Sequence, residues 1–227
     1  MMTLQSLGFW LIWLGLLSYG FFLASPDDPA TVDLITKLSI GQWDGLNPLL
    51  IGLFNVMGLW PLLYGSVLLA DGHGQIRKAW PFLLGSFALG AFSLLPYLAL
   101  RQPCPGWDPA GSATKGPSLR GVKIFESKIL GALVLVGVVV FLGYGLFWGD
   151  WADFVAQWQS SRFIHVMSLD FCCLSLLFPA LLGDDLARRG VTNPIAFWTI
   201  AALPLLGPAL YWLVRPPLVA TVAQTKL

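Results

Sequence analysis

Apolar residues dominate the chain in six long runs, each bounded by short polar segments. Each run has roughly the 20 residues that an α-helix needs to cross the hydrocarbon core of a bilayer. The pattern therefore predicts an all-α fold, an integral membrane bundle of six transmembrane helices. The predicted spans cover residues 7–24, 48–70, 79–100, 129–148, 163–182 and 194–214.

Two further segments are amphipathic and too short to cross a bilayer. Apolar side chains recur at intervals of three and four within residues 31–38 and again within residues 151–158. This spacing places them on one face of a helix. We predict two short helices that lie at the membrane interface.

The two halves of the chain share an order of elements. Each has an apolar run, an amphipathic segment, a run with an internal proline, a charged hairpin and a run that begins at a proline. Self-similarity of this kind indicates repeated architecture. We predict two three-helix halves, residues 1–103 and 129–217, joined by a flexible polar linker at 104–128 and followed by a polar tail at 218–227.

The charged hairpins align well, because Asp71 precedes Pro81 by ten residues and Asp184 precedes Pro194 by ten. Three spans per half is an odd number, so the second half would enter the membrane upside down. Inverted repeats are typical of secondary transporters, whose sites lie near the midplane beside broken helices.

Composition excludes several classes of protein. The chain is 56% hydrophobic and 11% charged, whereas about 25% charged residues is usual in soluble domains. The net charge is +1 and the basic residues are scattered, which argues against nucleic-acid binding. Three cysteines and two histidines form no metal-ligating pattern, so no metal site is predicted.

Asp170 is the most notable polar residue, since it lies well inside a predicted span. An ionisable side chain within a membrane is a functional-site hypothesis by default. One interpretation makes Asp170 a proton- or cation-responsive group. The other makes it a hydrogen-bonding contact between helices, with Asn55 as partner.

His165 lies about one turn into the same span, on a different face of the helix from Asp170. It could ligate a tetrapyrrole or hydrogen-bond a quinone. The alternative is an interfacial histidine that anchors the end of the helix.

The hairpin at residues 183–193 carries Asp184, Asp185, Arg188 and Arg189. Acid-to-base spacings of four allow pairing along a helix. Such a cluster suits either a solvated hairpin that sets topology or a docking surface for a partner subunit.

Several strings of the sequence resemble a family of multi-pass membrane proteins of unknown function in cyanobacteria and plant chloroplasts. They are SRFIHVMSLDF, LLGDDLARRG, LPLLGPALYWLVRPP and DPATVDLITKLSIGQWDGLNPLLIGLFNVMGLWP. The resemblance covers most of the chain outside the linker but includes no catalytic motif. It implies a thylakoid membrane, or the plasma membrane, of a photosynthetic cell.

The predicted function is therefore a non-enzymatic thylakoid protein that assists a photosynthetic complex and contacts chlorophyll, carotenoid or quinone. A small inverted-repeat transporter or exchanger that uses Asp170 and Asn55 is the alternative. An enzyme acting on an isoprenoid lipid or pigment is a third hypothesis.

Overall fold

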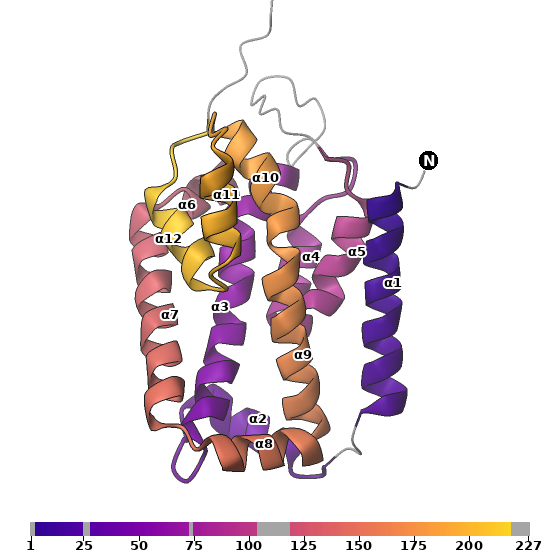
Figure 1. Ribbon diagram of the computed structural model, residues 1–227, viewed down its shortest axis with the longest axis vertical. Helices are drawn as coiled ribbons and strands as arrows, with labels where there is room; N and C mark the ends of the chain where they lie inside the picture. The colour runs from indigo at the N-terminus through magenta and orange to yellow at the C-terminus, as the bar shows by residue number, and fades with distance from the viewer. Residues whose placement is uncertain (1–2, 25–27, 73–74, 104–118, 219–227) are drawn as a thin grey trace, which may run out of the picture.

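The computed structural model describes residues 3–24, 28–72, 75–103 and 119–218, and this part of the chain folds as a bundle of helices (Figure 1). Four of its helical segments are long and apolar enough to cross a membrane. They are α1 (Leu4–Ser18) with its π-helical extension η1 (Tyr19–Leu23), α3 (Pro48–Asp71), α7 (Lys128–Trp148), and α9 (Arg162–Leu177) continued by α10 (Pro179–Arg188).

The two amphipathic segments form the predicted short helices, α2 (Thr31–Ile40) and α8 (Trp151–Ser160). Both lie at one end of the bundle, called here the α2–α8 end (Figure 1). The side chain of Asn47 joins α3 to α8 there, because its Nδ2 donates to the Asp150 carbonyl and to Asp153, each at 2.7 Å. The same Asn47 side chain caps α3 by accepting a hydrogen bond from the backbone N–H of Leu49.

The third apolar run is not a span. It is divided at Gly90 into α4 (Trp80–Leu89) and α5 (Ala91–Leu100), which fold back on each other. Gly90 has φ +50° and ψ −126°, a conformation that only glycine adopts without strain. The Ser93 hydroxyl donates to the Phe82 carbonyl across the hairpin at 2.8 Å.

The sixth apolar run is divided in the same way into α11 (Pro194–Ala201) and α12 (Leu206–Val214). The bend is at Leu205, which has φ +61°. Gly207 sits so close to the Ile200 carbonyl that a Cβ there would lie 2.1 Å from its oxygen. The two halves of this run therefore also pack as a helical hairpin.

Both hairpins enter and leave on one side of the bundle, opposite the α2–α8 end (Figure 1). Arg101, which follows α5, contacts Asp71 at the end of α3 at 2.9 Å, and Gln102 exchanges hydrogen bonds with Gln75. The expected six transmembrane helices are thus corrected to four helices of membrane-spanning length and two hairpins. Length and hydropathy alone cannot distinguish a span from a hairpin of the same composition.

Two spans and one hairpin per half change the predicted orientation. An even number of crossings returns the chain to its starting side, so the halves run in the same direction (Figure 1). Accordingly α1 and α7 both end beside the α2–α8 end, and α3 and α9 both begin there. The inversion predicted from three spans per half is corrected by this topology.

Buried charges tie each hairpin to the preceding long helix through the same contacts. Tyr97 donates a hydrogen bond to Asp71 at 2.6 Å, and Arg101 pairs with the same carboxylate. Tyr97 and Arg101 follow Asp71 by 26 and 30 residues. In the second half Tyr211 and Arg215 contact Asp185 at the same spacings of 26 and 30. Asp185 thus has the same spacing to Tyr211 and Arg215 as Asp71 has to Tyr97 and Arg101, one residue later than the alignment through the prolines.

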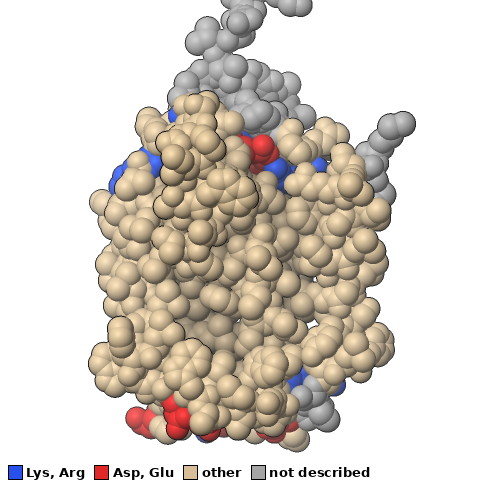
Figure 2. Space-filling view, in the orientation of Figure 1, with Lys and Arg blue, Asp and Glu red and all other residues tan. Residues whose placement is uncertain are grey.

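Charged side chains on the face shown in Figure 2 gather at the two ends of the bundle, with an uncharged band between them. This distribution is the one expected of a protein surrounded by lipid. The predicted linker contains a described helix, α6 (Leu119–Phe125), while residues 104–118 and 219–227 lie outside the described residues.

Candidate functional site

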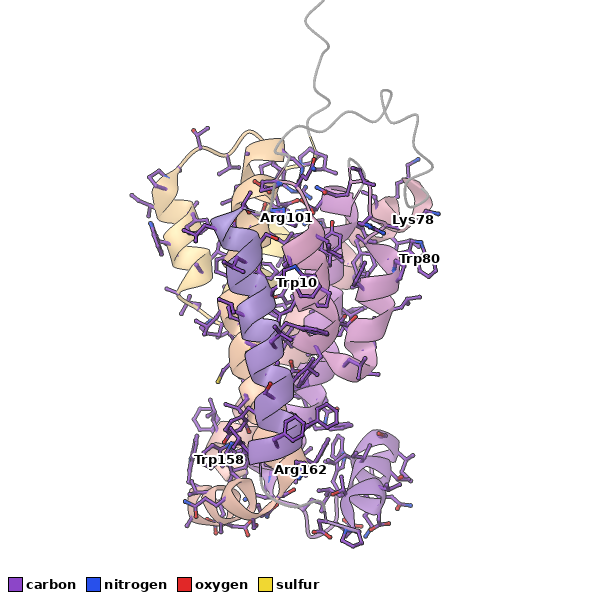
Figure 3. The ribbon with its side chains drawn as sticks, turned by 90° about the vertical axis from the view of Figure 1, so that its right-hand side faces the viewer. Trp10, Lys78, Trp80, Arg101, Trp158 and Arg162 are labelled. Carbon is purple, nitrogen blue, oxygen red and sulfur yellow. The ribbon has the colours of Figure 1, made fainter. Side chains whose placement is uncertain are left out.

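A cavity of about 910 Å³ lies between η1 and the lower part of α1, the tip of the α4–α5 hairpin, α3 and α9. Its volume is within the range of pockets for small organic ligands. Thr31 and Ser39 of α2 and Arg162 of α9 line it toward the α2–α8 end. Figure 3 shows Arg162 at this end of the molecule and Arg101 at the other.

Apolar groups form most of the cavity wall. Several lining residues are also exposed on the lipid-facing surface, among them Phe21 (67%) and Phe87 (51%). The cavity is therefore open toward the side of the bundle. The aromatic lining residues are Trp13, Phe21, Phe54, Phe87, Phe92 and Phe163.

Asp170 is the one carboxylate among the described residues that line the cavity, and it is 6% exposed. Its Oδ1 accepts a 2.7 Å hydrogen bond from the backbone N–H of Ala91, the first residue of α5. The helix N-terminus favours a carboxylate at this position. Its Oδ2 lies against Gly90 and has no hydrogen-bond partner among the described residues.

Two comparable helix pairs, α3 with α7 and α9 with η1, pack differently beside the cavity. α7 lies directly on α3, where a Cβ on Gly52 would be 2.7 Å from the Phe141 carbonyl and 3.3 Å from Gly145 Cα. Gly52 is the fifth residue of α3, and Val166 is the fifth residue of α9. Gly145 and Gly20 each lie three residues before the end of α7 and η1.

At the corresponding place between η1 and α9, valine therefore faces glycine. A Cβ on Gly20 would meet the Val166 side chain at 3.8 Å, an ordinary van der Waals distance. The nearest α9 atoms to Gly20 are thus side-chain atoms of Val166, whereas the nearest α7 atoms to Gly52 are backbone atoms. The cavity lies beside the Gly20–Val166 contact and extends to Asp170.

His165 lies beside this contact and is not a lining residue. Its Nε2 is 2.8 Å from the Tyr19 hydroxyl, its Nδ1 is 3.2 Å from the Trp158 carbonyl, and its ring stacks on Trp158. Both ring nitrogens thus have protein partners. This arrangement corresponds to the anchoring interpretation, since His165 joins η1 to α8 and α9.

Asn55 is not brought to Asp170. Its Nδ2 donates to the Ile51 carbonyl of its own helix at 2.8 Å, and it is not among the residues lining the cavity. The predicted Asn55–Asp170 contact is replaced by the bond between Asp170 and Ala91. Of the three predicted ligand-contacting residues, Asp170 alone lines the cavity.

The charged hairpin residues form no exposed docking surface. Asp185, Arg188 and Arg189 are at most 4% exposed, because they pair with groups distant in the sequence. Arg188 pairs with Asp71 at 2.6 Å, and Asp184 pairs with Arg101. The predicted Asp185–Arg189 pair forms at a spacing of four residues, at 2.8 Å.

Asp185 is the centre of the second-half cluster. Its carboxylate accepts from Tyr211, Arg189 and Arg215, and Glu126 pairs with both arginines. Burial lowers the pKa of the Arg215 guanidinium, and the Asp185 carboxylate opposes this effect. The cluster joins α10 to α12 and is structural.

Sequence reasoning missed Gly90 and the two tyrosines that bind the buried aspartates. The spacing of Asp, Tyr and Arg, repeated in the two halves of the chain, is the signal that could have identified the paired clusters. No comparable signal marks Gly90 or Val166, because both are ordinary residues of apolar helices.

The described residues contain no group of three or more His, Cys, Asp or Glu that could hold a metal ion. The cavity instead offers a long apolar surface with one acceptor deep inside and polar groups at its mouth. Comparison with family models, curated proteins and solved structures finds no match to the chain.

Proposed function

We propose that this protein is a non-enzymatic membrane protein that holds an apolar, membrane-soluble molecule in the cavity beside Asp170. The observation that carries the proposal is the combination of a 910 Å³ apolar cavity with a buried, half-satisfied carboxylate. A ligand pocket is typically apolar with a few placed polar groups.

The repeat supports this proposal, if the chain is two copies of one unit in the same orientation. The identical Asp, Tyr and Arg spacings argue for such a duplication. The close α3–α7 contact then fills the space whose counterpart between η1 and α9 is open as the cavity. The difference between the α3–α7 and η1–α9 contacts then has a role. It leaves room for a ligand where two helices would otherwise pack together.

The cellular setting rests on the sequence resemblance alone. It favours a thylakoid protein that accompanies a photosynthetic complex, with carotenoid, chlorophyll or quinone as the ligand. His165 is poorly suited to ligate chlorophyll, since both of its ring nitrogens already have partners.

The test is to purify the full chain in mild detergent and identify small molecules in its organic extract by absorbance and mass spectrometry. We expect a stoichiometric apolar molecule with the wild type and at least a tenfold loss of it in Val166→Trp, because the indole would occupy the cavity. Photosynthetic subunits in the eluate would support the accessory role.

Leu176→Trp is the matched control, since Leu176 lies on the same helix and is 79% exposed. It should retain the molecule. Equal amounts in both variants, or none in the wild type, would contradict ligand binding in this cavity.

Transport is the second candidate function. The observation in its favour is that Asp170 of α9 faces the N-terminus of the half-helix α5, and binding sites in transporters lie beside such half-helices. Flux into liposomes that is abolished by Asp170→Asn, with no ligand in the extract, would favour it.

A further inference from the structure

We infer that the molecule held in the cavity carries a hydroxyl group that donates a hydrogen bond to Asp170 Oδ2. This inference rests on the proposed function, and it specifies the chemical class of the ligand as a hydroxylated isoprenoid or polyene.

Asp170 defines where the polar end of the ligand lies. Ala91 N–H occupies Oδ1, whereas Oδ2 lies beside the hairpin tip without a partner among the described residues. An ionised carboxylate only accepts hydrogen bonds. A hydroxyl group both donates and accepts, so it satisfies Oδ2 whether the carboxyl group is ionised or protonated, while an aldehyde, quinone or carboxylate presents only acceptors and leaves an ionised Oδ2 unpaired.

The residues that line the cavity indicate the shape of the apolar part of the ligand, called here its body. The aromatic side chains of Trp13, Phe54, Phe92 and Phe163 come from four different elements and border one space. Aromatic faces favour flat, unsaturated groups over flexible saturated chains. Arg162 lies eight residues before Asp170 on α9, about 12 Å along the helix. The body therefore extends from Asp170 toward the membrane interface.

The experiment measures equilibrium binding of three labelled probes that share one isoprenoid polyene body: retinol, retinal and retinoic acid. Binding to the full chain in nanodiscs is followed by scintillation proximity. We expect retinol to bind at least tenfold more tightly than the other two, as one hydrogen bond to a charged acceptor implies.

Asp170→Asn should abolish this preference. Its amide oxygen must face Ala91 N–H, so its NH₂ group takes the place of Oδ2 and becomes a donor. The retinol hydroxyl and the retinal carbonyl can both accept from this group, so the two should bind with similar affinity. Ser175→Ala is the control, because the Ser175 hydroxyl bonds to Phe171 on the same helix outside the cavity lining; it should keep the wild-type order.

The outcomes separate the two claims. Equal binding of all three probes would overturn the hydroxyl inference and leave the proposed function standing. Tightest binding of retinoic acid, lost in Arg162→Gln, would also overturn it, since the ligand would then be an anionic amphiphile. Absence of binding by any probe, together with an organic extract free of ligand, would overturn both.

Discussion

Asp185→Ala is expected to lower the free energy of unfolding by about 3–5 kcal/mol, the cost typical of removing one partner from a buried ion pair. Asp185 is fully buried and accepts hydrogen bonds from Arg189, Arg215 and Tyr211. Without it, two buried guanidinium groups share Glu126 as their remaining carboxylate partner among the described residues. The measurement is chemical unfolding of the purified protein in mixed micelles.

Asp33→Ala is the control. The side chain of Asp33 also pairs with a cation four residues away, Lys37, but it is 64% exposed. Exposed pairs contribute little, so we expect a change of less than about 1 kcal/mol. If the two variants unfold alike, the buried cluster does not hold the α11–α12 hairpin as described.

Gly90→Ala is the second large effect, expected to cost about 2–4 kcal/mol from backbone strain together with a steric clash. Gly90 has φ +50°, and a Cβ there would lie 1.8 Å from Asp170 Oδ2. The carboxylate must move, so the variant should also lose bound ligand. Unfolding and ligand content are measured on the same preparations.

Gly41→Ala separates the two causes. Gly41 has φ +78° and nothing within 4 Å of its would-be Cβ, so it reports backbone strain alone, about 1–2 kcal/mol. Adding Asp170→Ala to Gly90→Ala should restore part of the lost stability. No recovery would show that the hairpin tip does not press on Asp170.

Local patterns predicted the parts of the fold that depend on local physics. The stripes of α2 and α8 specify short amphipathic helices, and four apolar runs form helices of spanning length. The hairpins escaped prediction because α4 with α5 is as apolar as a span. Its fold depends on the positive φ of Gly90 and on Arg101 returning to Asp71.

The site was predictable only in part. Asp170 can be identified as a candidate from the sequence alone, since carboxylates are rare inside membranes. Its partner is a backbone N–H 79 residues earlier, which no side-chain pattern reveals. The charges of residues 184–189 suggested an exposed surface because their partners Asp71, Arg101 and Glu126 are distant in sequence.

The most direct test of the central claim is an experimental structure of the protein purified from its own membrane without added lipid. The account predicts elongated density between η1 and α9 that runs from Arg162 to Asp170, with its inner end in hydrogen-bond contact with Oδ2. Direct packing of α1 on α9, as α7 packs on α3, would close the cavity and contradict the account.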